Sequence, residues 1–81
     1  MTNAEMLANA RAAIAKHVAA NSFVEADAYL RGWESRMHRI GMELPIAFRA
    51  NYSRNVARVV KTVSAEIIAA MRAHFNVSQI D

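Results

Sequence analysis

Two side chains in the middle of the chain have the spacing of a metal-ligand pair. Glu34 and His38 are four residues apart, so on a helix a carboxylate and an imidazole would project from one face. A zinc site needs three or four protein ligands, and neither His17 nor His74 has a spacing that obliges it to join this pair. We predict that Glu34 and His38 form a structural pair, that His17 and His74 are packing residues, and that the chain binds no metal and no cofactor.

The residue types needed for catalysis are scarce. With 0 Cys, the chain has no thiolate nucleophile, no disulfide and no cysteine-based zinc site. No serine stands where a histidine and an acid would converge, and we find no Gly-rich phosphate loop and no pair of inward-facing carboxylates. A chain of 81 residues also leaves little room for a small-molecule pocket of roughly 300 Å³. We predict that the protein is not an enzyme.

A concentration of positive charge is the most distinctive chemical feature. The segment from Arg49 to Lys61 carries four basic residues and no acidic one. On a helical wheel, Arg54, Arg58, Lys61 and the later Arg72 fall within about 60° of one another. We call these four residues the basic stripe. A helix that places them together presents a face suited to phosphates or to carboxylates.

Charge is arranged differently in the segment before it. Asp27 with Arg31, and Glu34 with His38, have the i,i+4 spacing of compensated surface charge. Between residues 46 and 75 the one acid, Glu66, is turned about 120° away from the basic stripe. The apolar Ile68 and Phe75 lie beside the stripe, and Arg49 lies near the preceding turn. The predicted partner-binding residues are Arg54, Arg58, Lys61, Arg72, Ile68, Phe75 and Arg49.

Three functions and a neutral interpretation compete for this surface. We expect a small helical binding protein that acts as a regulator or inhibitor by occupying an acidic surface of a protein partner, as anti-defence or host-takeover proteins of phages and mobile elements do. The alternative is a dimeric nucleic-acid-binding accessory protein that places the basic stripe on phosphates; the chain lacks a groove-reading motif. A solvated face without a partner, or a homodimeric assembly subunit, would also fit the pattern.

The helices that position these residues begin at two capping motifs. Thr2 with Glu5, and Ser22 with Glu25, match the S/T-x-x-E capping box. They predict helices over about residues 3–20 and 23–40. The first should bury an apolar arc of Met6, Leu7, Ala10, Ile14 and Val18.

The second and third helices are defined by their apolar periodicity. A seam of Phe23, Ala26, Leu30, Trp33, Met37 and Ile40 predicts the buried side of the second helix. Gly41 is predicted to end that helix in a left-handed conformation, and Pro45 to open a third helix over about residues 46–75. A break near Ser53 and a frayed tail at 76–81 are expected. The seam of the third helix is predicted to be Phe48, Tyr52, Val56, Val59, Val63, Ile67, Ala70 and His74.

Together these elements predict one all-α domain, residues 1–81, folded as a three-helix up-down-up bundle with a long third helix. Gly 2 and Pro 1 leave few points where helices can be interrupted. The start lacks the pattern of a secretory signal and no apolar run spans a bilayer, so we expect a cytoplasmic protein with no membrane partner. With 8 Arg against 2 Lys and 17 Ala, the composition is typical of a GC-rich, bacterial or phage coding sequence.

Overall fold

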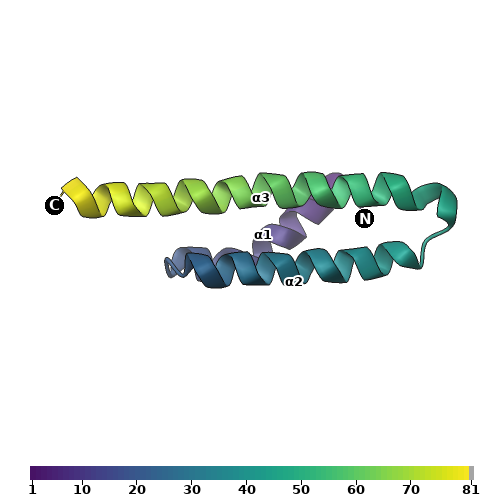
Figure 1. Ribbon diagram of the computed structural model, residues 1–81, viewed down its shortest axis with the longest axis horizontal. Helices are drawn as coiled ribbons and strands as arrows, with labels where there is room; N and C mark the ends of the chain where they lie inside the picture. The colour runs from purple at the N-terminus through teal and green to yellow at the C-terminus, as the bar shows by residue number, and fades with distance from the viewer. Residues whose placement is uncertain (81) are drawn as a thin grey trace.

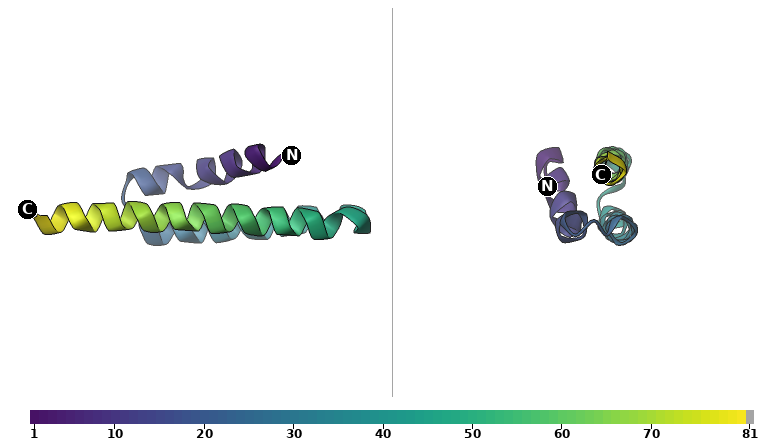
Figure 2. Two further views of the ribbon diagram at one scale, coloured as in Figure 1. Left: turned by 90° about the horizontal axis from the view of Figure 1, so that it is seen from above. Right: turned by 90° about the vertical axis from the view of Figure 1, so that its left-hand side faces the viewer.

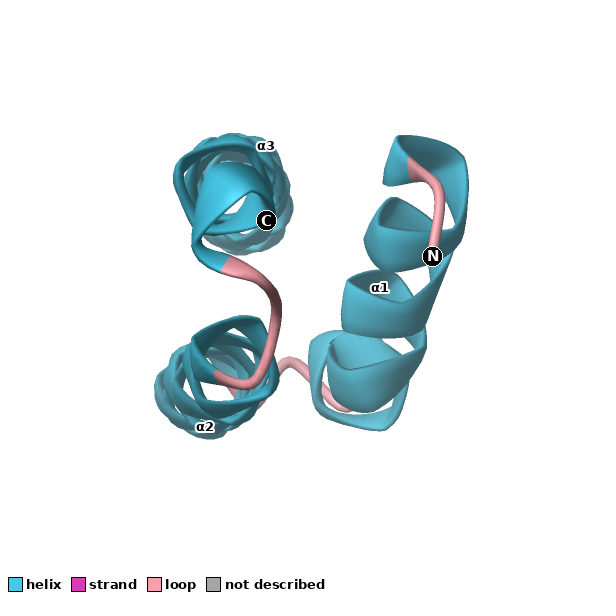
Figure 3. Ribbon diagram, turned by 90° about the vertical axis from the view of Figure 1, so that its right-hand side faces the viewer, coloured by secondary structure: helices cyan, strands magenta, loops and turns pink. Residues whose placement is uncertain are grey.

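The computed structural model contains three helices joined by two short turns: α1 (Asn3–Ala19), α2 (Phe23–Met42) and α3 (Ile46–Ile80) (Figure 3). It describes the backbone of residues 1–80 and the side chains of residues 1–76. α2 and α3 form an antiparallel hairpin, and α1 packs across both of them at an inclination (Figures 1 and 2). The predicted all-α, up-down-up bundle with a long third helix is confirmed.

The start of α1 forms the predicted capping box. The Thr2 hydroxyl accepts a hydrogen bond from the Glu5 amide at 3.2 Å, and the Glu5 carboxylate accepts one from the Thr2 amide at 3.1 Å. Each bond satisfies a backbone donor that the first helical turn leaves without a partner. The cap therefore sets the first residue of α1.

The second predicted capping box, at Ser22, is wrong. Ser22 precedes α2, but its side chain makes no capping hydrogen bond. The reason lies in the turn: Asn21 adopts φ 58°, and the amides of Asn21 and Ser22 donate back to Val18 and His17 of α1. These two bonds form a Schellman motif, which ends α1. The motif also fixes the backbone of Ser22, at φ −93° and ψ 72°, and in this conformation its hydroxyl does not cap α2.

The core lies where the three apolar faces meet. α1 contributes Met6, Ala10 and Ile14, as predicted, with Leu7 and Val18 half-buried at the edge. α2 contributes Ala26, Leu30, Trp33 and Met37. The Trp33 indole N–H donates to the Asn9 side-chain oxygen at 2.8 Å, which satisfies the one polar atom of the largest buried side chain.

Gly41 is not a left-handed helix end. It lies inside α2, is buried, and has no positive φ. A Cβ atom there would lie 2.8 Å from Tyr52 Cδ1, so the absence of a side chain allows the α3 aromatic ring to pack on the α2 backbone. Gly41 thus takes the place on the α2 seam that we predicted for Ile40, which is 47% exposed.

α3 is continuous through Tyr52 and Ser53, so the break expected there is absent. Its buried residues are Val56, Val59, Val60, Val63 and Ile67. Two predicted seam residues are wrong: Phe48 is 62% exposed, and His74 is exposed.

Both errors have one cause, which is that α3 is longer than the elements that cover it. α1 begins beside residues 55–62 of α3 and does not reach its first two turns (Figure 2). At the other end His74 lies level with Phe23, the first residue of α2, and α3 extends beyond that point (Figure 1). The predicted frayed tail, 76–81, lies partly outside the described residues; the helix continues to Ile80, and Asp81 is not described.

Among the described residues, none of the helices combines the length and the apolar character that crossing a bilayer requires.

Candidate partner-binding surface

The straight course of α3 brings the four residues of the basic stripe onto one side of the molecule. Arg54, Arg58, Lys61 and Arg72 are all exposed. Because they point about 180° away from the buried valines, the core holds the helix while the cations face solvent. From Arg54 to Arg72 the stripe is about 27 Å long at 1.5 Å per residue.

The stripe has no acidic neighbour in the described part of the chain. None of its four side chains forms an ion pair with a carboxylate there. Glu66, the one acid in the described part of α3, lies on another side of the helix and is bound to Arg11 of α1. As predicted, the basic stripe has no ion-paired carboxylate within the described residues.

Charge on α2 is balanced only in part. Arg31 lies 3.5 Å from both Asp27 and Glu34, and His38 lies 4.0 Å from Glu34, so the predicted i,i+4 pairs are present. Arg36 and Arg39, in contrast, form no ion pair with the described residues. Arg36 flanks the apolar seam of α2, where the sequence suggested that it could extend the binding surface. Arg39 was missed, because its i,i+4 spacing from Glu43 predicts a compensated pair.

Arg49 does not join the basic stripe. Its Nε donates to the Leu44 carbonyl at 2.8 Å, so the side chain closes the turn between α2 and α3. It also lines a hollow of about 170 Å³ with Gly41 and Tyr52, on the α2 side of the helix. As a predicted binding residue, Arg49 stands apart from the other six.

The two apolar residues of the predicted surface are accessible beside the stripe. Ile68 is 44% exposed and Phe75 is 54% exposed. They line two adjoining hollows between α2 and α3, where they meet Met71 and Val24. Val24, at 85% exposed, was missed because it lies off the apolar seam of α2 and looks like a surface residue in the sequence.

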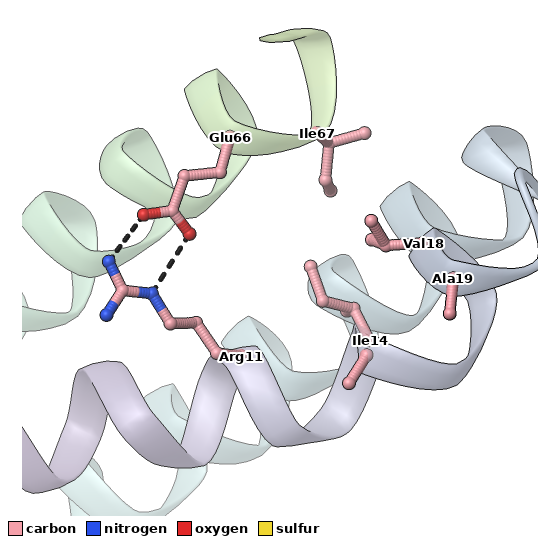
Figure 4. A pocket seen from close by; sticks show the side chains of 7 residues that line it. Arg11, Ile14, Val18, Ala19, Glu66 and Ile67 are labelled. Atoms are coloured by element: carbon pink, nitrogen blue, oxygen red, sulfur yellow. Dashed lines mark hydrogen bonds and ion pairs between the residues drawn. The ribbon is translucent and has the colours of Figure 1, made fainter. Parts of the chain in front are cut away.

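On the opposite flank of α3, an ion pair crosses to α1 (Figure 4). Arg11 Nε donates to Glu66 Oε1 at 3.0 Å, and Arg11 Nη2 donates to the second carboxylate oxygen. This two-pronged bond lowers the pKa of Glu66 and raises that of Arg11. The pair stands at the edge of an open groove of about 340 Å³, which also contains Ile14, Val18 and Ile67.

Two of the three histidines, His17 and His74, make ring contacts. His17 stacks on Tyr29 with ring centroids 4.4 Å apart, and its Nδ1 lies 3.2 Å from the Glu25 carboxylate. His74 contacts the rings of Phe23 and Phe75 at 5.9 and 5.5 Å. No cluster of three or more potential metal ligands exists among the described residues.

The grooves between the helices are larger than we predicted. We expected the bundle to lack space of roughly 300 Å³, but two of its grooves each measure about 340 Å³. Both are open to solvent and mostly apolar, and they lie between helices rather than inside the core. The prediction of too little space for a small molecule was therefore wrong, whereas the prediction that the protein is not an enzyme rests on the residue types alone.

No protein-family model matches this chain, and the comparisons with curated proteins and with solved structures give no match either.

Proposed function

We propose that this protein is a small non-enzymatic binding protein that regulates or inhibits an acidic protein partner by covering part of its surface. The observation that carries the proposal is the basic stripe, which is exposed, held on a continuous helix and without a carboxylate neighbour in the described residues. A cationic side chain that forms no ion pair within the described residues is available to form one with a partner molecule. Arginine is well suited to this because its guanidinium binds a carboxylate through two hydrogen bonds.

The mechanism is steric. The stripe steers the encounter with an acidic patch, and the apolar Ile68 and Phe75 beside it add contact area once the two surfaces meet. No bond is made or broken in the partner. Its activity changes because the covered surface is no longer available to substrates or to other proteins.

The test uses two charge-reversed variants of equal net charge. In one, Arg54→Glu is combined with Arg58→Glu; in the control, Arg36→Glu is combined with Arg39→Glu, which alters two cations on α2 that are also exposed and also without an ion pair in the described chain. The proteins are immobilised and exposed to a bacterial lysate, and captured proteins are identified and quantified by mass spectrometry.

We expect wild type and the α2 variant to capture the same acidic protein, and the stripe variant to lose it by roughly tenfold or more because attraction becomes repulsion. If both variants capture equally well, the stripe is solvated surface and the proposal fails. Circular dichroism of each variant verifies that the helical content is unchanged.

A nucleic-acid partner would give a different result. Four phosphate contacts predict a slope of about −3.6 in log K against log salt concentration. Binding of random duplex DNA and RNA, measured at about 50 and 200 mM salt, would then weaken by more than a hundredfold. Such a loss, abolished in the stripe variant, would replace the protein partner by a polyanion.

A further inference from the structure

The start of α2 and the second half of α3 enclose a continuous apolar groove. It consists of two hollows of about 340 and 310 Å³ that share Phe23, Val24 and Met71. Ile68 lines one hollow and Phe75 the other. We call these five residues and the space between them the α2–α3 groove. Three of the five side chains are 44–85% exposed, so the groove is an apolar surface that the described residues leave uncovered.

The two walls of the groove differ in charge. On α3 the exposed face next to the groove carries Lys61 and Arg72, which do not line the hollows themselves and form no ion pair within the described residues. On α2 the wall carries Glu25, Asp27 and Arg31. Asp27 and Arg31 lie 3.5 Å apart, and Glu25 lies 3.2 Å from His17 Nδ1. An occupant therefore meets positive charge beside α3 and more carboxylates than cations along α2.

The length of the groove fits a short helix. From Ser64 to Phe75 it spans about 16 Å at 1.5 Å per residue, which is three helical turns. An apolar stripe of three or four side chains at i, i+4 and i+7 would fill this length, as in other complexes in which a helix occupies a groove. The walls are themselves helices, so such an occupant would complete a local three-helix arrangement.

A second copy of this chain supplies less of the complementary charge. In a twofold-symmetric dimer built on this groove, Met71, which lines both hollows, would face its own copy. The α3 helix of that copy carries cations beside Ile68 and Phe75, as this one does, and its one acid in the described residues, Glu66, lies on another side of the helix. An acidic helix supplies the carboxylates that a second α3 lacks at this position.

We infer that the α2–α3 groove binds one amphipathic helix of the partner, with its apolar face against Ile68, Met71 and Phe75 and an acidic edge on Lys61 and Arg72. The inference rests on the proposed function, because it names the part of the acidic partner that the surface recognises. It adds that the partner's helix lies in the α2–α3 groove in one orientation. This addition can be wrong even if the partner binds through the basic stripe.

The probe is a synthetic amphipathic helix of about 14 residues, with leucine at i, i+4 and i+7 and glutamate along one flank. The control peptide carries glutamine in place of each glutamate. Both are titrated into the isotope-labelled protein, and binding is followed by NMR. We expect the acidic peptide to shift the amide signals of Val24, Ile68, Met71 and Phe75, and the control peptide to bind at least about fivefold more weakly.

Matched variants separate groove binding from general attraction. Ile68→Ser combined with Phe75→Ser should weaken the acidic peptide about tenfold or more. Ile46→Ser combined with Phe48→Ser makes the same chemical change at side chains that are 81% and 62% exposed, far from the groove, and should leave the affinity unchanged. All four side chains lie outside the core, so thermal melts should show that both variants fold.

The titration and sedimentation experiments could overturn the inference in three ways. The acidic peptide could fail to bind, or its signal shifts could follow the basic stripe and be insensitive to the groove variant. Sedimentation could also show a dimer that the groove variant abolishes, which would assign the groove to a second copy. If lysate capture depends on Arg54 and Arg58 but not on Ile68 and Phe75, the inference fails and the proposed function stands; if capture depends on neither pair, the proposed function fails.

Discussion

Alanine substitution at the two glycines of α2 should change stability in opposite directions. A Cβ atom at Gly32 would lie 3.7 Å from Arg36 Nη1, an ordinary contact with the end of a flexible side chain. A Cβ atom at Gly41 would lie 2.8 Å from Tyr52 Cδ1 and 3.1 Å from Cε1, which is too close for carbon atoms. The ring is held by packing at the α2–α3 interface and by a contact of 3.6 Å from its hydroxyl to Met37 Sδ, so it has little freedom to move away.

The expected magnitudes follow from two opposing contributions. Alanine is favoured over glycine inside a helix by about 1 kcal/mol, and Gly32→Ala should gain most of this. Gly41→Ala gains less, because it lies next to the last residue of α2, and inserting a methyl group into a filled interface costs about 1–3 kcal/mol. In a chain of this size about 1 kcal/mol shifts Tm by roughly 4–8 °C. We expect Gly32→Ala to melt several degrees above wild type and Gly41→Ala several degrees below it.

Thermal unfolding by circular dichroism measures both changes, and a double-mutant cycle identifies their cause. Tyr52→Ala removes the ring that Gly41 accommodates, so Gly41→Ala should cease to destabilise in that background, with a coupling energy of at least about 1 kcal/mol. The reasoning is refuted if Gly41→Ala raises Tm as Gly32→Ala does, or if the effect of Gly41→Ala is the same with and without Tyr52.

Two further predictions concern the helix cap and the inter-helix ion pair. Thr2→Ala removes an observed capping bond and should cost about 1 kcal/mol in chemical unfolding, whereas Ser22→Ala removes none and should stay within about 0.5 kcal/mol of wild type; equal losses would contradict the capping geometry. Because Arg11 lowers the pKa of Glu66 below its ordinary 4.5, the pair stabilises the folded state above that pH and the contribution is lost as the pH falls through the folded-state pKa. The urea midpoint of wild type should therefore fall more steeply below pH 4.5 than that of Glu66→Gln, and parallel curves would show that the pair contributes nothing.

The fold followed from the sequence where local signals and burial agree. The capping box at Thr2 and the 3,4 spacing of Ala26, Leu30, Trp33 and Met37 identify a helix start and a buried face without tertiary information. The box at Ser22 failed because the same residue also closes the Schellman motif of α1, and the sequence pattern does not show which geometry prevails.

Other errors arose because burial depends on what covers a helix. Phe48 continues the period of the valines but lies beyond the reach of α1, so periodicity alone could not predict its exposure. Gly41 looked like a helix end, and its true role depends on Tyr52, eleven residues later in the chain and across an interface. Val24 became relevant only when the start of α2 was placed against α3.

The basic stripe lies on the side of α3 that does not pack against the core, so it can be changed without changing the fold. Its four side chains point away from the core, and the residues that hold α3 in place are Val56, Val59, Val63 and their neighbours on the opposite side. Like charges at i,i+4, such as Arg54 and Arg58, disfavour a helix by about 0.2–0.5 kcal/mol per pair, so the bundle gains no stability from carrying the stripe. Reversing these charges should therefore leave folding nearly unchanged, and a loss of binding in such variants reports on the surface itself. An acidic partner would relieve the repulsion that the free protein carries.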